Sequence, residues 1–474
     1  MPTNSSRKGF ATVRTITLSA ALCGISLFEL AARGTGIGEL RLPTWILMGC
    51  VILLGLGRIG LREYYLLAIS AVVTVVVLQT VPQPLTEIAP SLDQAAFLMA
   101  FIILLSALNE VAATSPSVAE CGAFLTRQPP ARRYYSISGG TALMSVVFNL
   151  SILSLLVPLI QNGIRRADRA DGLDAIREQR QISALLRGFA WSVIWSPTAV
   201  APLVLYDLLP EADRLRWILT GLVLFAAILV VGALEDAYRF RKYRARFRAD
   251  VPPFPRTAAL RLAATAGWLF CLAFLSMSLS GESFVFGLMM ACPLMLLGWL
   301  AVQHGYPRAF DRKSYRLALS RVLIGGIDKS VPIAVTLACS GYIGRAAAGL
   351  VPVEDIATFL NLDDVPEFVL LAAIPPVLSC LSMLAMSPIM LAVFFGTLFA
   401  SLPFLPADPT LLALAISCGW SLSMTCSPFS GPTILIARAG RIPMATLTFR
   451  WNLGFTLICA VLLVPAFWLL TGGR

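Results

Sequence analysis

The chain has 474 residues, of which 57% are hydrophobic and 13% are charged, and its mean hydropathy is +0.79. That charged fraction is about half of the roughly 25% found in soluble domains, and apolar runs near 20 residues recur throughout, which predicts an all-α polytopic membrane protein. The net charge of +11 comes from arginines clustered in short loops between apolar runs, where they orient helices, so nucleic-acid binding is excluded.

Composition also argues against several site chemistries. The ten cysteines lie mostly inside apolar runs without a CxxC pair, and His304 is the only histidine, so we expect no disulfide, no metal site and no cofactor beyond a coupling ion. No apolar segment carries paired carboxylates or a Ser/His arrangement, so the sequence does not indicate an enzyme.

The apolar segments follow in chain order, beginning after the basic residues Arg7, Lys8 and Arg14. They are residues 15–32, 44–57, 66–80, 94–113, 137–161, 182–206, 217–235, 258–279, 282–303, 317–344, 366–401, 409–437 and 446–471. The first could be a signal peptide ending near "LAARG", but Glu29 interrupts it, and we expect an uncleaved helix whose N-terminus is cytoplasmic.

Loop charges predict that two of these segments do not cross the membrane. If 137–161 crossed once, the basic loop at 165–180 and every later basic loop would face outward, against the positive-inside rule. The segment 366–401 is too long for one helix and has acidic flanks. With both as re-entrant hairpins, about 11 transmembrane helices remain.

The same map predicts four regions along the chain. They are an extra N-terminal helix and loop (1–43), a first repeat (44–235), a basic cytoplasmic linker (236–257) and a second repeat (258–474). Because the first repeat starts outside and the second starts inside, the two repeats are inverted. Inverted repeats with interrupted helices are typical of secondary transporters.

A repeated motif marks the two interruptions. "GFAWSVIWSP" (188–197) and "GWSLSMTCSP" (419–428) both read G-x3-S-x3-S-P, and they lie 231 positions apart. Pro197 and Pro428 each remove a helical donor and free the carbonyl four residues back, and backbone broken at membrane depth survives only inside protein or beside a watery cavity.

Serines, threonines and one asparagine surround the predicted breaks and hairpin tips and could bind a substrate. The alternative is that Ser and Thr bond back to their own turn and that Pro only kinks the helix. The candidate substrate contacts are Asn149, Ser151, Ser196, Thr198, Ser387, Ser427 and Thr433, and the prolines that hold the breaks open are Pro197, Pro388 and Pro428.

Polar and charged residues at depth are candidates for ion coupling. Asn109 and Glu110 end the fourth crossing, although an interfacial glutamate is the simpler interpretation. Asp328 could form a buried pair with Lys329, or both could lie at the interface with Lys329 extending toward water.

Two further charged positions lie near the ends of predicted crossings, and the first of them has two interpretations. Arg187 could face an inner vestibule and attract anions, or extend to the interface. The run Arg450, Trp451 and Asn452 is typical of an interfacial anchor.

This map resembles the ion transporter superfamily, which includes divalent-anion and citrate symporters, arsenite-permease-like proteins and the large membrane subunits of tripartite periplasmic (TRAP) transporters. The resemblance covers about residues 44–471, and "VTLACSGYIGRAAAGL" (335–350) looks like a small-residue helix of TRAP subunits. Of the Ser-Asn-Thr pattern at symporter hairpin tips, only Asn149 matches.

The resemblance implies an elevator-type secondary transporter of a small, carboxylate-like anion, coupled to Na+ or H+, and a homodimer in a bacterial inner membrane. Two alternatives remain: a TRAP-type large subunit working with a periplasmic binding protein, and a non-transporting membrane protein of the cell envelope.

Overall fold

The computed structural model describes residues 4–166, 171–243, 253–352, 365–402 and 404–473, without the side chains of residues 4–13, 131 and 328. All regular secondary structure within these ranges is helical. The chain forms two compact units, each built from two stretches of sequence. Unit 1 combines Met1–Ser115 with Arg261–Leu350, and unit 2 combines Pro116–Leu260 with Val351–Arg474.

Unit 1 contains the extra N-terminal helix and the first long apolar helices of each predicted repeat. Its elements are α1 (Asn4–Thr35), η1 (Gly38–Leu40), α2 (Arg41–Gly55), α3 (Leu61–Thr80), α4 (Leu85–Ala113), most of α11 (Arg256–Ser280), α12 (Phe284–Gln303), α13 (Arg312–Ser320), η2 (Arg321–Gly326), η3 (Ile327–Ser330) and α14 (Val331–Gly349).

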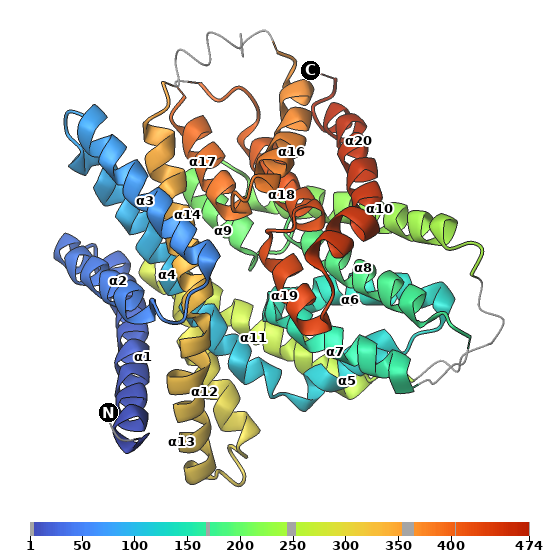
Figure 1. Cartoon of the computed structure of the whole chain (residues 1–474), viewed down its shortest axis with the longest axis horizontal. Helices are drawn as coiled ribbons and strands as arrows, with labels where there is room; N and C mark the ends of the chain where they lie inside the picture. The colour runs from blue at the N-terminus through green and yellow to red at the C-terminus, as the bar shows by residue number, and fades with distance from the viewer. Residues whose placement is uncertain (1–3, 167–170, 244–252, 353–364, 403, 474) are drawn as a thin grey trace. The chain divides into compact units, whose positions relative to one another are not determined.

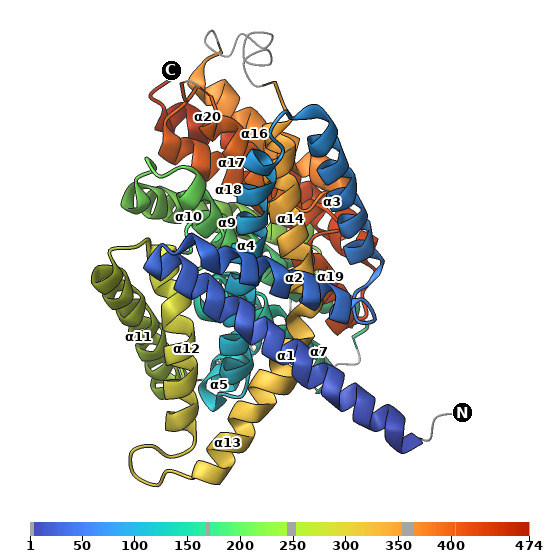
Figure 2. The same cartoon turned by 90° about the vertical axis from the view of Figure 1, so that its left-hand side faces the viewer.

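The centre of unit 1 is the pair α4 and α14, against which α1, α3 and α12 pack. Small residues permit this close contact: a Cβ on Gly341 would lie 2.6 Å from a methyl carbon of Leu98. Figure 2 shows α1 and α2 in contact and α12 joined to α13 by a turn. Hydrophobic side chains from α4, including Phe97 and Phe101, are almost completely buried there.

Unit 2 contains both hairpins and both interrupted helices (Figure 1). Its elements are α5 (Pro116–Thr126), α6 (Pro130–Phe148), α7 (Ser151–Arg166), α8 (Asp174–Ser192), α9 (Val200–Leu208), α10 (Arg214–Arg239), α16 (Glu367–Met383), α17 (Pro388–Ala400), α18 (Pro409–Cys426), α19 (Gly431–Gly440), η4 (Thr446–Asn452) and α20 (Leu453–Leu470).

Helix contacts in unit 2 come in matching pairs. The first arm of each hairpin packs on the interrupted helix that follows it, as α6 on α8 and α16 on α18. The second arm packs on the short half-helix of the other repeat, as α7 on α19 and α17 on α9. The two repeats therefore interlock within unit 2.

The prediction of an all-α polytopic membrane protein is confirmed. Within the described ranges, ten helical segments are long and apolar enough to cross a membrane. The predicted crossing at 182–206 is not among them, because it divides into α8, with a charged first half, and the nine-residue α9. The short helix α5 was not expected from the sequence, since it lies in a region interpreted as loop.

The compact units cut across the predicted repeats. Each unit takes one part from residues 44–235 and one from 258–474, so a boundary between repeats along the chain is not a boundary between folded bodies. The inverted relation of the repeats and the re-entry of the hairpins stay predictions.

Candidate functional site

The two repeated motifs end two helices in the same way. α8 ends at Ser192 and α9 begins at Val200, while α18 ends at Cys426 and α19 begins at Gly431. Three backbone hydrogen bonds of the first break recur 231 positions later. In the first break, the bonds are Ser196 N–H to Ser192 O (2.9 Å), Ala199 N–H to Ser196 O (3.1 Å) and Leu203 N–H to Ala199 O (3.3 Å). The equivalent bonds of the second break are Ser427 N–H to Ser423 O (2.9 Å), Ser430 N–H to Ser427 O (3.3 Å) and Ile434 N–H to Ser430 O (3.0 Å).

The glycine of each motif lies where the interrupted helix crosses the first arm of its hairpin. A Cβ on Gly188 would lie 2.1 Å from the backbone oxygen of Ser138 on α6. A Cβ on Gly419 would lie 2.9 Å from the Cβ of Leu378 on α16. Only glycine allows backbones this close, so the motif begins with a packing requirement.

The hydroxyls of the motifs then tie each break to the hairpin of its own repeat. Ser145 Oγ on α6 donates to Ser192 Oγ at 2.8 Å, and Thr198 Oγ1 donates to the Val146 carbonyl. In the second repeat, Ser427 Oγ donates to the Ser382 carbonyl near the end of α16 at 2.8 Å. Each break is thus held against the end of the first hairpin arm.

The carbonyls that the two prolines free are treated differently. Pro428 leaves the Met424 carbonyl without a helical donor, and the hydroxyls of Ser430 and Thr433 bind it at 3.3 and 3.2 Å. Pro197 correspondingly leaves the Val193 carbonyl, and no hydrogen bond from a described residue reaches that oxygen. Among the described residues, the Val193 carbonyl of the first break therefore has no donor, whereas the Met424 carbonyl of the second break has two.

The hairpin tips hold polar side chains that remain available. Asn149 has a positive φ of 42° and joins α6 to α7, and Ser387 is the N-terminal flanking residue of α17. Within the described part of the chain, nothing hydrogen-bonds the side chains of Asn149, Ser151 or Ser387. The buried Ser382 Oγ near the second tip is also without a partner among described residues.

The structure thus separates the predicted substrate contacts into two groups. Ser196, Thr198, Ser427 and Thr433 are at most 2% exposed and are used in bonds within the protein. The alternative interpretation predicted bonds back to the residue's own turn. Thr198, Ser427 and Thr433 instead donate to carbonyls of another helix. Each hydroxyl oxygen still has acceptor capacity. The side chains of Asn149, Ser151 and Ser387 make no hydrogen bond to a described residue, and substrate contact by all seven residues stays a prediction.

The predicted coupling residues belong to unit 1, whereas all predicted substrate contacts belong to unit 2. Asn109 is buried, and its Oδ1 has no partner among described residues. Lys329 Nζ lies 3.3 Å from Glu110, with both side chains substantially exposed. The backbone of Asp328 belongs to η3, but its side chain lies outside the described residues. No group of three or more metal-ligating side chains occurs in the described ranges.

Sequence reasoning missed a buried ionic cluster in unit 2. Arg187 on α8 is 3% exposed; its Nη1 lies 2.7 Å from Glu235 on α10, and its Nε donates to Asn452 Oδ1 at 2.9 Å. Its guanidinium also lies 4.1 Å from the ring centre of Phe455 on α20. Arg187 therefore neither extends to an interface nor faces open space, and Asn452, expected as an interfacial anchor, is fully buried.

A second, partly buried pair continues this cluster along the same two helices. Arg180, two helical turns before Arg187, lies 2.6 Å from the buried Asp236. Arg239 extends from α10 to the carbonyls of Arg450 and Trp451. The cluster joins α8 and α10 of the first repeat to η4 and α20 of the second.

Comparison with known proteins supports the fold and not a family. No family model matches the chain, and no curated protein matches it in sequence. Among solved structures, it is similar to the YdaH transporter of Alcanivorax borkumensis, described as having an unusual topology, with a TM-score of 0.56 and 13% identity. The match covers 87% of this chain and 99% of that protein, so this chain has the fold of a membrane transporter.

Proposed function

We propose that this chain is a secondary active transporter of a small, carboxylate-like anion, coupled to Na+ or H+, in a bacterial inner membrane with its N-terminus in the cytoplasm. The observation that carries the proposal is the pair of helix breaks with matching hydrogen bonds inside one compact unit. A single helix break can be an accident of packing. Two breaks share three backbone hydrogen bonds, and each lies beside a hairpin tip whose polar side chains have no partner among the described residues. This arrangement favours a binding site built from two equivalent halves.

The chemistry of these elements favours an anion. Four helices of unit 2 begin at a tip or a break: α7, α9, α17 and α19. The first N–H groups of a helix lack intrahelical acceptors and carry partial positive charge. Ser387 makes no capping bond to α17, so the N–H groups of its first turn remain for a ligand. The amide of Asn149 adds a further donor.

The division into units supports an elevator-type mechanism. Both tips and both breaks lie in unit 2, and the buried cluster around Arg187 ties its repeats together. In the proposed mechanism, unit 2 carries the anion as one body, and unit 1, with the coupling candidates Asn109, Glu110 and Asp328, forms the scaffold of a homodimer. The open Val193 carbonyl gives unit 2 an acceptor suited to a coupling cation.

Uptake into proteoliposomes containing the purified chain alone tests the proposal. Labelled di- and tricarboxylates are offered under an imposed sodium or proton gradient. Accumulation that follows one gradient supports a single-chain symporter and identifies its coupling ion. No accumulation by folded protein contradicts it; recovery on adding a periplasmic binding protein would indicate a TRAP-type subunit instead.

A matched pair of variants locates the site. Asn149→Ala removes an unpaired amide at the first tip, while Asn162→Ala removes an exposed amide at the other end of the same hairpin. We expect KM to rise by about 10-fold to 100-fold in the first, since one hydrogen bond to a charged ligand is worth about 1.5–3 kcal/mol, and to stay unchanged in the second. Equal effects would contradict a role for the tip.

A further inference from the structure

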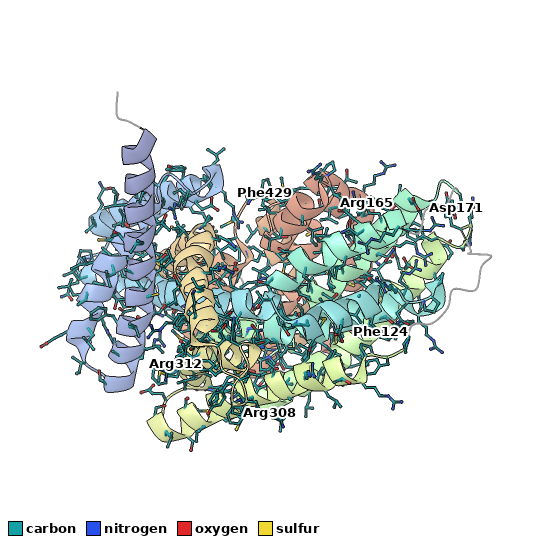
Figure 3. All side chains as sticks on the ribbon, turned by 90° about the horizontal axis from the view of Figure 1, so that it is seen from below. Phe124, Arg165, Asp171, Arg308, Arg312 and Phe429 are labelled. Atoms are coloured by element: carbon teal, nitrogen blue, oxygen red, sulfur yellow. The ribbon has the colours of Figure 1, made fainter. Side chains whose placement is uncertain are left out.

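The turn between α12 and α13 carries an unusual concentration of cations and aromatic rings. Its exposed cations are Arg308, Arg312, Lys313 and Arg316, and within the described residues none of them has a carboxylate partner. Asp311, the single acid between them, caps α13 by accepting from the backbone N–H groups of Lys313 and Ser314. Arg308 and Arg312 are labelled in Figure 3.

Aromatic side chains form a compact cluster in the same turn. Phe310 is central, with ring centres 6.2 Å from Tyr306 and 5.3 Å from Tyr315, and His304 lies 6.4 Å from Tyr315. Tyr306 is nevertheless 60% exposed. Tyrosine rings of this kind favour the boundary between hydrocarbon and water, because one end is apolar and the other polar.

An exposed apolar surface leads away from the turn. On α12 it consists of Leu294, Leu297 and Val302, which are 50%, 42% and 63% exposed. Leu317 on α13 is also exposed, at 52%. α12 is a candidate membrane span ending at Gln303, and its 20 residues extend about 30 Å, the thickness of a bilayer core. The cations therefore lie at the end of a lipid-length apolar face.

We propose that the turn His304–Arg316 binds anionic phospholipid, with the four cations on the headgroup phosphates and the acyl chains along the apolar face of α12. A soluble acidic protein or a nucleic acid would complement the charge but leave the adjoining apolar face uncovered. A phospholipid has both chemistries in the order that the surface presents them: phosphate first, then hydrocarbon. This inference concerns unit 1 and does not depend on what the chain transports.

The test compares phosphatidylglycerol with phosphatidylcholine, added in increasing mole fraction to the full chain in neutral detergent. For the unaltered protein we expect phosphatidylglycerol to raise the Tm more than phosphatidylcholine does, and to remain bound in native mass spectra. In a variant with Arg308→Gln, Arg312→Gln, Lys313→Gln and Arg316→Gln, the extra Tm increase produced by phosphatidylglycerol over phosphatidylcholine should be lost, because these cations supply the attraction to the anionic headgroups.

A control variant removes the same charge elsewhere. It carries Arg127→Gln, Arg132→Gln, Arg165→Gln and Arg166→Gln, four exposed cations of unit 2. The control should keep the preference for phosphatidylglycerol, and both variants should match the unaltered protein in phosphatidylcholine, which shows that they are folded. The proposal is overturned if the first variant keeps the preference, or if the control loses it equally, because then net charge and not this turn attracts the lipid.

Discussion

The buried cluster around Arg187 leads to a sharp prediction about stability. Arg187→Met keeps most of the side-chain volume but leaves Glu235, whose side chain is 13% exposed, without its partner at 2.7 Å. It also leaves Asn452 Oδ1 without its donor and removes the cation over the Phe455 ring. Removing one partner of a buried pair costs about 3–5 kcal/mol. Glu235 keeps a contact of 3.5 Å to the less buried Arg239, so we expect a loss near 3 kcal/mol.

The free energy of unfolding should be measured in detergent, or the Tm as its proxy. In a large domain 1 kcal/mol shifts the Tm by about 2–4 °C, which gives a decrease on the order of 10 °C. Arg216→Met is the matched control. It breaks an arginine–carboxylate pair of similar length, 2.6 Å to Asp408, but with side chains 48% and 31% exposed, and such pairs contribute about 0–1 kcal/mol.

A double variant separates the ion pair from simple loss of packing. Arg187→Met with Glu235→Leu removes both charges, and replacing a buried pair by apolar side chains of similar volume is often neutral. The double variant should therefore recover most of the lost stability. The reasoning is refuted if Arg187→Met costs no more than Arg216→Met, or if the double variant is as unstable as the single one.

Two further predictions concern the repeated motif. Gly188→Ala places a Cβ 2.1 Å from the Ser138 backbone oxygen, and it should lower the Tm and the folded yield at a cost of about 1–3 kcal/mol. The control Gly267→Ala, whose Cβ meets no atom within 4 Å, should be neutral or stabilising. Equal Tm values for the two variants would contradict the close crossing at Gly188. Pro428→Ala supplies the N–H that Pro428 lacks, so the break after Ser427 can close into helix, and uptake should fall by about tenfold or more while folded yield stays within about twofold. Unchanged uptake would show that the break does not serve transport.

The sequence was sufficient for most of the elements of this fold. Apolar run length located nearly all the helices. Loop charge and segment length predicted that 137–161 and 366–401 are re-entrant hairpins; each contains two helices, with turns at Asn149 and after Met383, while re-entry stays a prediction. The motif predicted both breaks to within a few residues, because proline removes a donor wherever it stands.

The parts that could not be predicted depend on long-range contacts. Arg187 meets Glu235 and Asn452, which lie 48 and 265 positions away, and no local pattern pairs them. Likewise, a serine hydroxyl looks the same in the sequence whether it caps a carbonyl, as Ser430 does, or remains unpaired, as Ser387 does. The boundaries of the two compact units depend on which helices pack against each other, and the hydrophobic periodicity of a sequence does not indicate packing partners.

The interlocking of the repeats in unit 2 has a consequence for biosynthesis. α7 and α9 leave the ribosome long before α19 and α17, the helices against which they pack. At roughly 5–20 residues per second, the delay is on the order of tens of seconds. Throughout that time the first break has only elements of the first repeat beside it, namely its own hairpin and α10, whose Trp217 Nε1 donates to the Ile194 carbonyl at 2.9 Å. An unpaired backbone group costs several kcal/mol in hydrocarbon. The first repeat must therefore remain in contact with protein or water, and not with lipid alone, until the second repeat has been synthesised.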